Sequence, residues 1–327
     1  MVTLDIGKLC MEIEMAVDAF TTAQRRMLAR HGVDAESRFL DIPSIAGRAQ
    51  VLVVGDGPAV VMINGIGTPA AMWAPLMARL SGFRLYAVDL PGFGLTDSVR
   101  DLTRRYRAAA VQFLNETLDR LGLDRAAFVA NSLGSRWAIW LALDAPERVS
   151  AMVHIGCPAT VLGTSAPLPM RLLSVPPLAR LLMKLQPPSH KQVEQLSKMV
   201  HQYPLDPELA DLLVATERLP HFEHTFLATL NTLVRLRGAR PGTALSAGEL
   251  GRIRQPTQIV WGDDDPMGST DVARRVAEAI PDAELHIVEG GHAPWLTQAD
   301  RIGSLATAFL GEHAAARPTA CGSAPPR

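Results

Sequence analysis

Short apolar runs that alternate with amphipathic windows are the feature that most limits how this chain can fold. The runs have the length of strands, end at Gly, Pro or Asp, and predict strands at 38–42, 50–54, 59–63, 84–89, 126–130, 149–155, 257–261 and 284–288. Windows with one apolar face predict helices at 106–121, 133–143, 270–279 and 299–310. Strands that alternate with helices at this spacing imply an α/β fold with a mostly parallel central sheet, flanked by helices on both faces.

The alternation stops at residues 158–252. This stretch is rich in proline, shows no convincing strand, and contains helical windows near 191–202, 207–217 and 222–237. We therefore expect an inserted helical segment between two parts of one α/β core, at 37–157 and 253–312. Before the core, residues 1–36 predict an extra N-terminal helix, which either packs on its own domain or makes a dimer or lid contact. After the core, the tail at 313–327 is expected to be disordered.

The composition excludes several function classes. Lys and Arg number 32 against 33 Asp and Glu, so no global field favours nucleic acid or an anionic membrane. The three cysteines are scattered and lack the spacing of a thiolate zinc site or a disulfide framework. No secretory signal and no apolar run of membrane-spanning length is visible, so we expect a cytoplasmic protein.

The segment 128–135 joins a predicted strand directly to a predicted helix and carries Ser132 at the junction. A serine on so sharp a turn needs small residues two positions before and after it, and Ala130 and Gly134 meet this requirement. Taken alone, the pattern is equally compatible with Ser132 as an ordinary helix N-cap.

Four further segments make the pattern specific. In chain order they are 64–67 (Asn-Gly-Ile-Gly), 89–94 (Asp-Leu-Pro-Gly-Phe-Gly), 261–265 (Trp-Gly-Asp-Asp-Asp) and 290–294 (Gly-Gly-His-Ala-Pro). The serine turn lies between the second and the third of them. With these landmarks the chain resembles the α/β-hydrolase superfamily over about residues 37–312. The resemblance implies that the segment 158–252 is a helical cap, which closes the cleft and shapes the substrate pocket.

The resemblance also assigns roles to individual residues. Ser132 would be the nucleophile, His292 the general base and Asp265 the acid that orients it, with Asp263 left open as the alternative acid. The backbone amides of Ile66 and Leu133 would form the oxyanion hole. Asp89, in its Asp-x-Pro-Gly loop, is interpreted as structural.

The expected substrate is a small apolar or aromatic molecule. Apolar side chains and small turn residues near the landmark loops predict the pocket, namely Asn64, Gly65, Met72, Trp73, Met267 and Trp295. We expect no metal, because His221 and His224 lack a third ligand pattern, and no cofactor, because no nucleotide-binding glycine motif is present.

The leading functional hypothesis is a cofactor-independent serine hydrolase that cleaves a carboxylic ester, lactone or related acyl bond. A close alternative is C–C bond hydrolysis of a vinylogous dioxo acid by the same three residues. Acyl transfer or lyase activity, and a non-catalytic ligand receptor or biosynthetic scaffold on the same fold, also stay open. The sequence does not identify the substrate or decide between a monomer and a homodimer.

Overall fold

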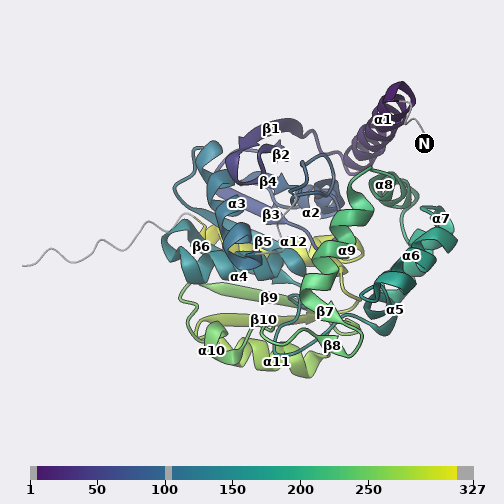
Figure 1. Ribbon diagram of the computed structural model, residues 1–327. Coiled ribbons are helices and arrows are strands. Elements are labelled where there is room, and N and C mark those ends of the chain that lie inside the picture. Colours follow the sequence, from purple (N-terminus) through teal and green to yellow (C-terminus); the bar gives the residue numbers. More distant parts are fainter. Residues whose placement is uncertain (1–5, 100–104, 315–327) are drawn as a thin grey trace, which may run out of the picture.

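The computed structural model describes residues 6–99 and 105–314, and its centre is an eight-stranded sheet (Figure 1). In spatial order the strands are β1 (Glu36–Ile42), β2 (Gly47–Val54), β4 (Arg84–Val88), β3 (Ala59–Ile63), β5 (Ala126–Asn131), β6 (Val149–Ile155), β9 (Thr257–Gly262) and β10 (Ala283–Val288). Strand β2 is antiparallel to both of its neighbours, and every pair from β4 to β10 is parallel. The mostly parallel α/β sheet predicted from the sequence is confirmed.

Helices cover both faces of this sheet. Figure 1 shows α3 and α4 in front of the strands and α12 behind them. The core helices are α2 (Ala74–Met77), α3 (Tyr106–Arg120), α4 (Leu133–Asp144), α11 (Thr270–Ala279) and α12 (Ala299–His313). Short 3-10 turns lie between the elements of the core, namely η1 (Pro43–Ile45), η2 (Ala70–Trp73), η3 (Pro146–Arg148) and η4 (Pro294–Leu296). Every residue of β5 and β6 is buried, because both faces of these central strands are covered.

The segment 158–252 is mostly helical. It contains α5 (Leu168–Leu172), α6 (Pro176–Leu185), α7 (His190–Met199), α8 (Pro207–Glu217), α9 (Phe222–Leu233) and α10 (Ala247–Leu250), with a small hairpin of β7 (Val234–Arg235) and β8 (Gly238–Ala239). The expectation that this segment lacks strands is wrong at the hairpin, because α9 ends at Leu233 and Val234 is extended at φ −129° and ψ 161°. In Figure 1, α5 to α9 form one layer beside the carboxyl ends of the central strands.

The N-terminal helix α1 (Ile6–Arg30) packs against α8 of this layer (Figure 1). Phe20 and Met27 are its most completely buried side chains, and Arg30 lies 3.4 Å from the carboxylate of Asp206 at the start of α8. The N-terminal helix therefore packs on a helix of the inserted segment. At the other end of the chain, most of the tail predicted to be disordered, 315–327, lies outside the described residues.

No helix within residues 6–99 and 105–314 combines the length and the apolar composition needed to cross a bilayer.

Candidate active site

Ser132 is the single residue between the end of β5 and the start of α4. Its backbone has φ 52° and ψ −109°, a strained conformation for a residue with a Cβ. The turn is tight because α4 packs directly on β3: a Cβ at Gly134 would lie 2.2 Å from the carbonyl oxygen of Ile63. In the described structure the Ser132 side chain makes no capping hydrogen bond to α4, so the geometry is the strained strand-to-helix turn rather than a simple N-cap.

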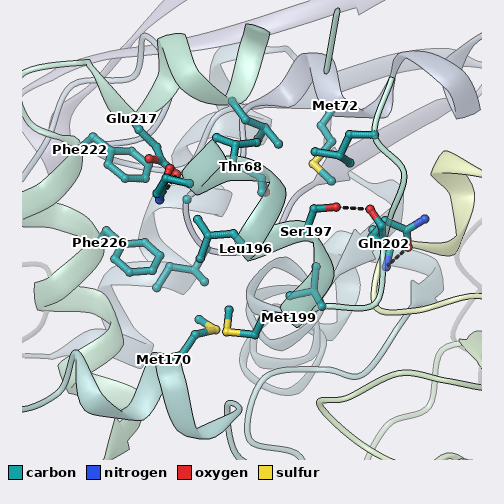
Figure 2. Close-up of a pocket in the computed structure, with 18 of the residues that line it drawn as sticks. Thr68, Met72, Met170, Leu196, Ser197, Met199, Gln202, Glu217, Phe222 and Phe226 are labelled. Atoms are coloured by element: carbon teal, nitrogen blue, oxygen red, sulfur yellow. Dashed lines mark hydrogen bonds between the residues drawn. The ribbon is translucent and has the colours of Figure 1, made fainter. Parts of the chain in front are cut away.

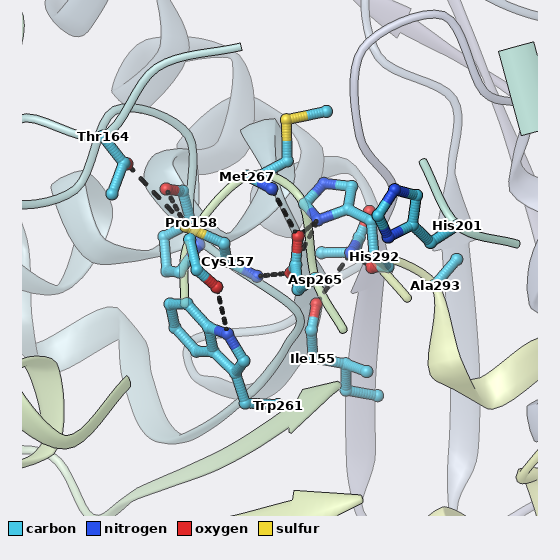
Figure 3. A network of polar contacts seen from close by, with 12 residues as sticks. Ile155, Cys157, Pro158, Thr164, His201, Trp261, Asp265, Met267, His292 and Ala293 are labelled. Carbon is cyan, nitrogen blue, oxygen red and sulfur yellow. Dashed lines mark hydrogen bonds and ion pairs between the residues drawn. The ribbon is translucent and has the colours of Figure 1, made fainter. Parts of the chain in front are cut away.

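Asp265 and His292 meet at the carboxyl ends of β9 and β10 (Figure 3). His292 Nδ1 lies 3.0 Å and 2.9 Å from the two carboxylate oxygens of Asp265. The carboxylate also accepts hydrogen bonds from the backbone N–H groups of Cys157 and Met267, both at 2.8 Å. Because Asp265 is an acceptor held from two sides, it selects the His292 tautomer that carries its proton on Nδ1.

The opposite ring nitrogen of His292 is buried and has no hydrogen-bond partner among the described residues. With the proton on Nδ1, this Nε2 atom carries a free lone pair. The imidazole is thus prepared to accept a proton from a group beside it.

The two neighbouring aspartates lie elsewhere. Asp263 is exposed and accepts a hydrogen bond from the backbone N–H of Gly290 at 3.0 Å. Asp264 is also exposed and pairs with His201 at 3.0 Å. Of the three consecutive aspartates, Asp265 is the one that contacts His292.

The loop that carries His292 is held by residues that sequence reasoning missed. The side-chain amide of Asn131 donates to the carbonyl oxygens of Ile155 at 2.7 Å and His292 at 3.0 Å. From the inserted segment, the carbonyl of Val200 accepts from His292 N at 3.1 Å, and Gln202 Oε1 accepts from Ala293 N at 3.2 Å. The position of Asn131 next to the serine was a signal in the sequence, whereas the contacts of Val200 and Gln202 depend on how the insertion packs.

The predicted oxyanion turn lies against Ser132. A Cβ at Gly65 would be 3.2 Å from Ser132 Cβ and 3.7 Å from its Oγ. Ile66 lines both cavities described below. Leu133 is the first residue of α4, so its N–H has no intrahelical carbonyl partner and points to the start of the helix. The two amides named from the sequence are therefore on the segments that surround the serine.

Asp89, directly after β4, holds the loops that follow β3 and β4. Its carboxylate is fully buried and accepts hydrogen bonds from Ala70 N at 2.6 Å and Leu95 N at 3.3 Å. Burial raises the pKa of Asp89 to about 7. These bonds tie two loops together, as its structural interpretation predicts.

Two cavities adjoin the serine turn. The smaller has a volume of about 50 Å³ and is lined by Ser132 together with Cys157, Thr160, Thr164, Ser165 and Met267. The larger, of about 180 Å³, has mainly apolar walls, which include Met72, Leu196, Met199, Phe222, Phe226 and Leu296 (Figure 2). Ile66 and Met170 line both cavities, so the two share part of their walls, and Ser132 lines the smaller one.

The sequence-predicted pocket is partly wrong. Met72 lines the larger cavity and Met267 the smaller. The other four predicted residues line neither cavity, namely Asn64, Gly65, Trp73 and Trp295. Trp73 and Trp295 are fully buried and stack on each other with ring centroids 4.3 Å apart, because η2 and η4 turn both indoles into the core. Asn64 is also buried and donates from Nδ2 to the carbonyl of Pro69 at 2.6 Å.

Most of the larger cavity's wall comes from the inserted helices, which sequence reasoning did not identify residue by residue. The side chains that were missed include Gln192, Leu196, Glu217, Phe222 and Phe226. Within the described residues, no three His, Cys, Asp or Glu side chains are grouped so that they could hold a metal ion.

Comparison with known proteins gives the same fold. Residues 58–299 match the alpha/beta hydrolase fold family. Over 287 residues the chain is 29% identical to a 2-hydroxy-6-oxononadienedioate/2-hydroxy-6-oxononatrienedioate hydrolase from a Pseudomonas species, an alignment that covers 84% of this chain and 96% of the relative. Over 269 residues it is 31% identical to a 2-hydroxy-6-oxo-6-phenylhexa-2,4-dienoate hydrolase from Comamonas testosteroni, with 78% and 88% covered.

Two solved structures are similar to the whole fold. The meta-cleavage product hydrolase CumD from Pseudomonas fluorescens superposes with a TM-score of 0.70 at 25% identity, covering 84% of this chain and 97% of that one. The carboxylesterase CesB from Bacillus subtilis superposes with a TM-score of 0.73 at 24% identity, covering 90% and 98%. From the family match and the shared sheet we conclude that the chain belongs to the α/β-hydrolase fold family and is a hydrolase.

Proposed function

We propose that the protein hydrolyses a carboxylic ester, lactone or related acyl bond of an uncharged, apolar or aromatic small molecule. The observation that carries the proposal is the buried Asp265–His292 hydrogen bond beside the strained turn of Ser132. An aspartate that fixes a histidine tautomer, near a half-buried serine that lines a cavity, is the arrangement that activates a serine for attack on a carbonyl.

In the proposed reaction Ser132 Oγ attacks the carbonyl carbon while His292 Nε2 takes the hydroxyl proton. Asp265 stabilises the imidazolium that forms. The N–H groups of Ile66 and Leu133 donate to the developing oxyanion. The imidazolium then gives its proton to the leaving alcohol, and a water molecule activated by His292 releases the acid from the acyl-enzyme.

The lining of the larger cavity supports an uncharged substrate. Among the described residues that line it there is no Lys, Arg or His, and the one ionisable side chain is an acid, Glu217. A substrate carboxylate placed there would lose its hydration without gaining a cationic partner, and this transfer is strongly unfavourable. An ester or lactone carries no such charge.

C–C bond hydrolysis of a vinylogous dioxo acid is the second candidate. It is supported by the relatives at 29% and 31% identity, which are named as hydrolases of such acids. In this chain the smaller cavity would have to receive the carboxylate. Thr160, Thr164 and Ser165 line it, and the buried guanidinium of Arg136 donates a hydrogen bond to the Thr160 hydroxyl.

Labelling with a fluorophosphonate, followed by intact-mass spectrometry, tests the shared part of both candidates. We expect one adduct on the native chain and none on Ser132→Ala. Absence of an adduct on the folded native protein, with small and large probes alike, would contradict a hydrolytic serine and favour a receptor or scaffold. Matched panels of uncharged esters, lactones and dioxo acids then separate the candidates by the products formed. Higher kcat/KM on the dioxo acids would overturn the ester assignment.

A further inference from the structure

The larger cavity contains few polar side chains, and most of them are already bonded within the protein. Thr68 donates its hydroxyl to the carbonyl of Gly65 at 3.1 Å. Ser197 donates to the backbone carbonyl of Gln202, and the side-chain oxygen of Gln202 accepts from Ala293 N. These groups therefore hold the wall of the cavity in place.

Gln192 in α7 and Glu217 at the end of α8 differ from the other polar lining groups. Gln192 Nε2 donates to Glu217 Oε1 at 3.2 Å, which links the two helices. The amide oxygen of Gln192 is buried and has no hydrogen-bond partner among the described residues. The pair thus places one unpartnered acceptor oxygen, that of Gln192, beside the Glu217 carboxyl in a cavity whose walls are mainly apolar.

The pair lies away from the catalytic loops. In Figure 2, Glu217 is beside Phe222 on one side of the cavity, and Gln202, which bonds to the residue after His292, is on the opposite side. A substrate whose carbonyl is at Ser132 and whose apolar part fills this cavity would direct its far end toward Glu217.

A buried acceptor without a donor, such as the Gln192 amide oxygen, is unfavourable, so a ligand that brings a donor to it is stabilised relative to one that does not. The donor that suits this site is uncharged, since an ammonium group would lose its hydration among Phe222, Phe226 and Leu196. Burial also raises the pKa of Glu217 to about 7, so its carboxyl is partly protonated near neutral pH and forms a weaker site for a cation.

We propose that Glu217 and Gln192 recognise a hydroxyl group at the distal end of an apolar substrate. This inference rests on the proposed ester hydrolysis and narrows its substrate class to hydroxylated apolar esters.

The experiment uses p-nitrophenyl alkanoates from butanoate to decanoate, each compared with its ω-hydroxy and ω-amino analogue. A second set carries the same three terminal groups on the alcohol side of the ester, so that either orientation in the cavity is covered. For one chain length we expect kcat/KM for the hydroxy ester to exceed that for its methyl-terminated analogue by about 10-fold, the effect of one satisfied buried hydrogen bond.

Two variants test the residue. Glu217→Leu should abolish the preference for the hydroxy ester and raise activity on the methyl-terminated one. Glu217→Gln keeps the shape and an acceptor oxygen, so it should retain most of the preference. p-Nitrophenyl acetate, which has no acyl chain to place in the cavity, gives the reference rate against which each protein's hydroxyl preference is normalised, and thermal melting checks that both variants fold.

The outcomes separate the two proposals. No hydrolysis of p-nitrophenyl acetate or any other ester by the native protein contradicts the proposed function. Hydrolysis of the acetate without a hydroxyl preference at any length, or a preference unchanged in Glu217→Leu, overturns the role of the pair. A stronger preference for the ω-amino esters also overturns it, in favour of a cation site.

Discussion

The side-chain amide of Asn131 lies 3.0 Å from the backbone carbonyl oxygen of His292. The residue that precedes the proposed nucleophile therefore also holds the loop of the proposed general base. The same amide bonds to the carbonyl of Ile155 at the end of β6. The ends of β5 and β6 and the loop that follows β10 are joined at this one side chain.

Replacing Asn131 should lower the rate of the chemical step. In Asn131→Ala both hydrogen bonds are lost, and in Asn131→Asp the shape stays while a carboxylate oxygen faces two carbonyls. We expect kcat on a short aryl ester to fall at least about 10-fold in both variants, with little change in KM, because the His292 loop loses its support. Steady-state kinetics and thermal melting measure this. Equal loss of kcat and of folded protein would instead assign Asn131 to stability alone.

Asp265 and Asp263 form a matched pair for testing the acid. In Asp265→Asn, an amide would point a donor at the N–H of Cys157 or Met267 and would no longer stabilise the imidazolium. We expect kcat to fall by about 10³ to 10⁴. Asp263→Asn, at an exposed position two residues away, should stay within about 2-fold of the native rate, since its contact with Gly290 N is preserved by the amide oxygen. The reverse order of effects would make Asp263 the acid.

A methyl group at Gly65 should disturb the serine turn. It would lie 3.0 Å from Asn131 Oδ1 and 3.2 Å from Ser132 Cβ, which is closer than such atoms usually approach. We expect Gly65→Ala to reduce kcat by about 10- to 100-fold through misplacement of the reacting groups. Gly311→Ala in α12, where an added Cβ meets nothing within 4 Å, is the control and should keep full activity. A fully active Gly65→Ala would show that the turn tolerates the shift.

His154 should make the protein sensitive to acid. This histidine in β6 is buried, and neither ring nitrogen has a partner among the described residues. Burial lowers the pKa of His154 from 6.5 to about 4, so the unfolded chain binds a proton more readily than the folded one. The contribution of neutral His154 to the free energy of unfolding is fully present above pH 6.5. It is lost as the pH falls toward 4, by about 3 kcal/mol in total.

Urea unfolding of the native protein and His154→Leu between pH 7.5 and 4.5 measures this difference. Asp89 and Glu217, whose pKa values are raised to about 7, contribute a slope of opposite sign in the same range, but they are present in both proteins. The free energy of unfolding should therefore fall more steeply with acid in the native protein than in the variant. Parallel curves would contradict a neutral buried His154.

The sheet and the catalytic loops could be predicted because their signals are local. Strand-length apolar runs end at turn residues, and the helix predicted at 270–279 is α11 itself. The aspartate at 265 and the histidine at 292 follow neighbouring parallel strands, whose carboxyl ends must lie at one edge of the sheet. Proximity of these two residues therefore follows from topology alone.

The insertion was harder to predict for two physical reasons. No helix was predicted at α6, yet Pro176 and Pro177 begin it, because at the start of a helix a missing N–H leaves no hydrogen bond unmade. The cavity wall depends on how α7, α8 and α9 pack over the core, and no local pattern in the sequence carries that information. For the same reason Trp295 was expected in the pocket, although it packs on Trp73 in the core.

The bonds from Val200 and Gln202 to the His292 loop restrict how a substrate can be admitted. If the whole insertion moved away from the sheet as a rigid body, the His292 loop would lose two of its hydrogen-bond partners, and the alignment of His292 would be lost each time the site opened. The segment around residues 200–202 is therefore expected to stay in place on the core. Opening is then confined to parts of the insertion that make no such bond, and the histidine stays aligned while one molecule leaves and the next arrives.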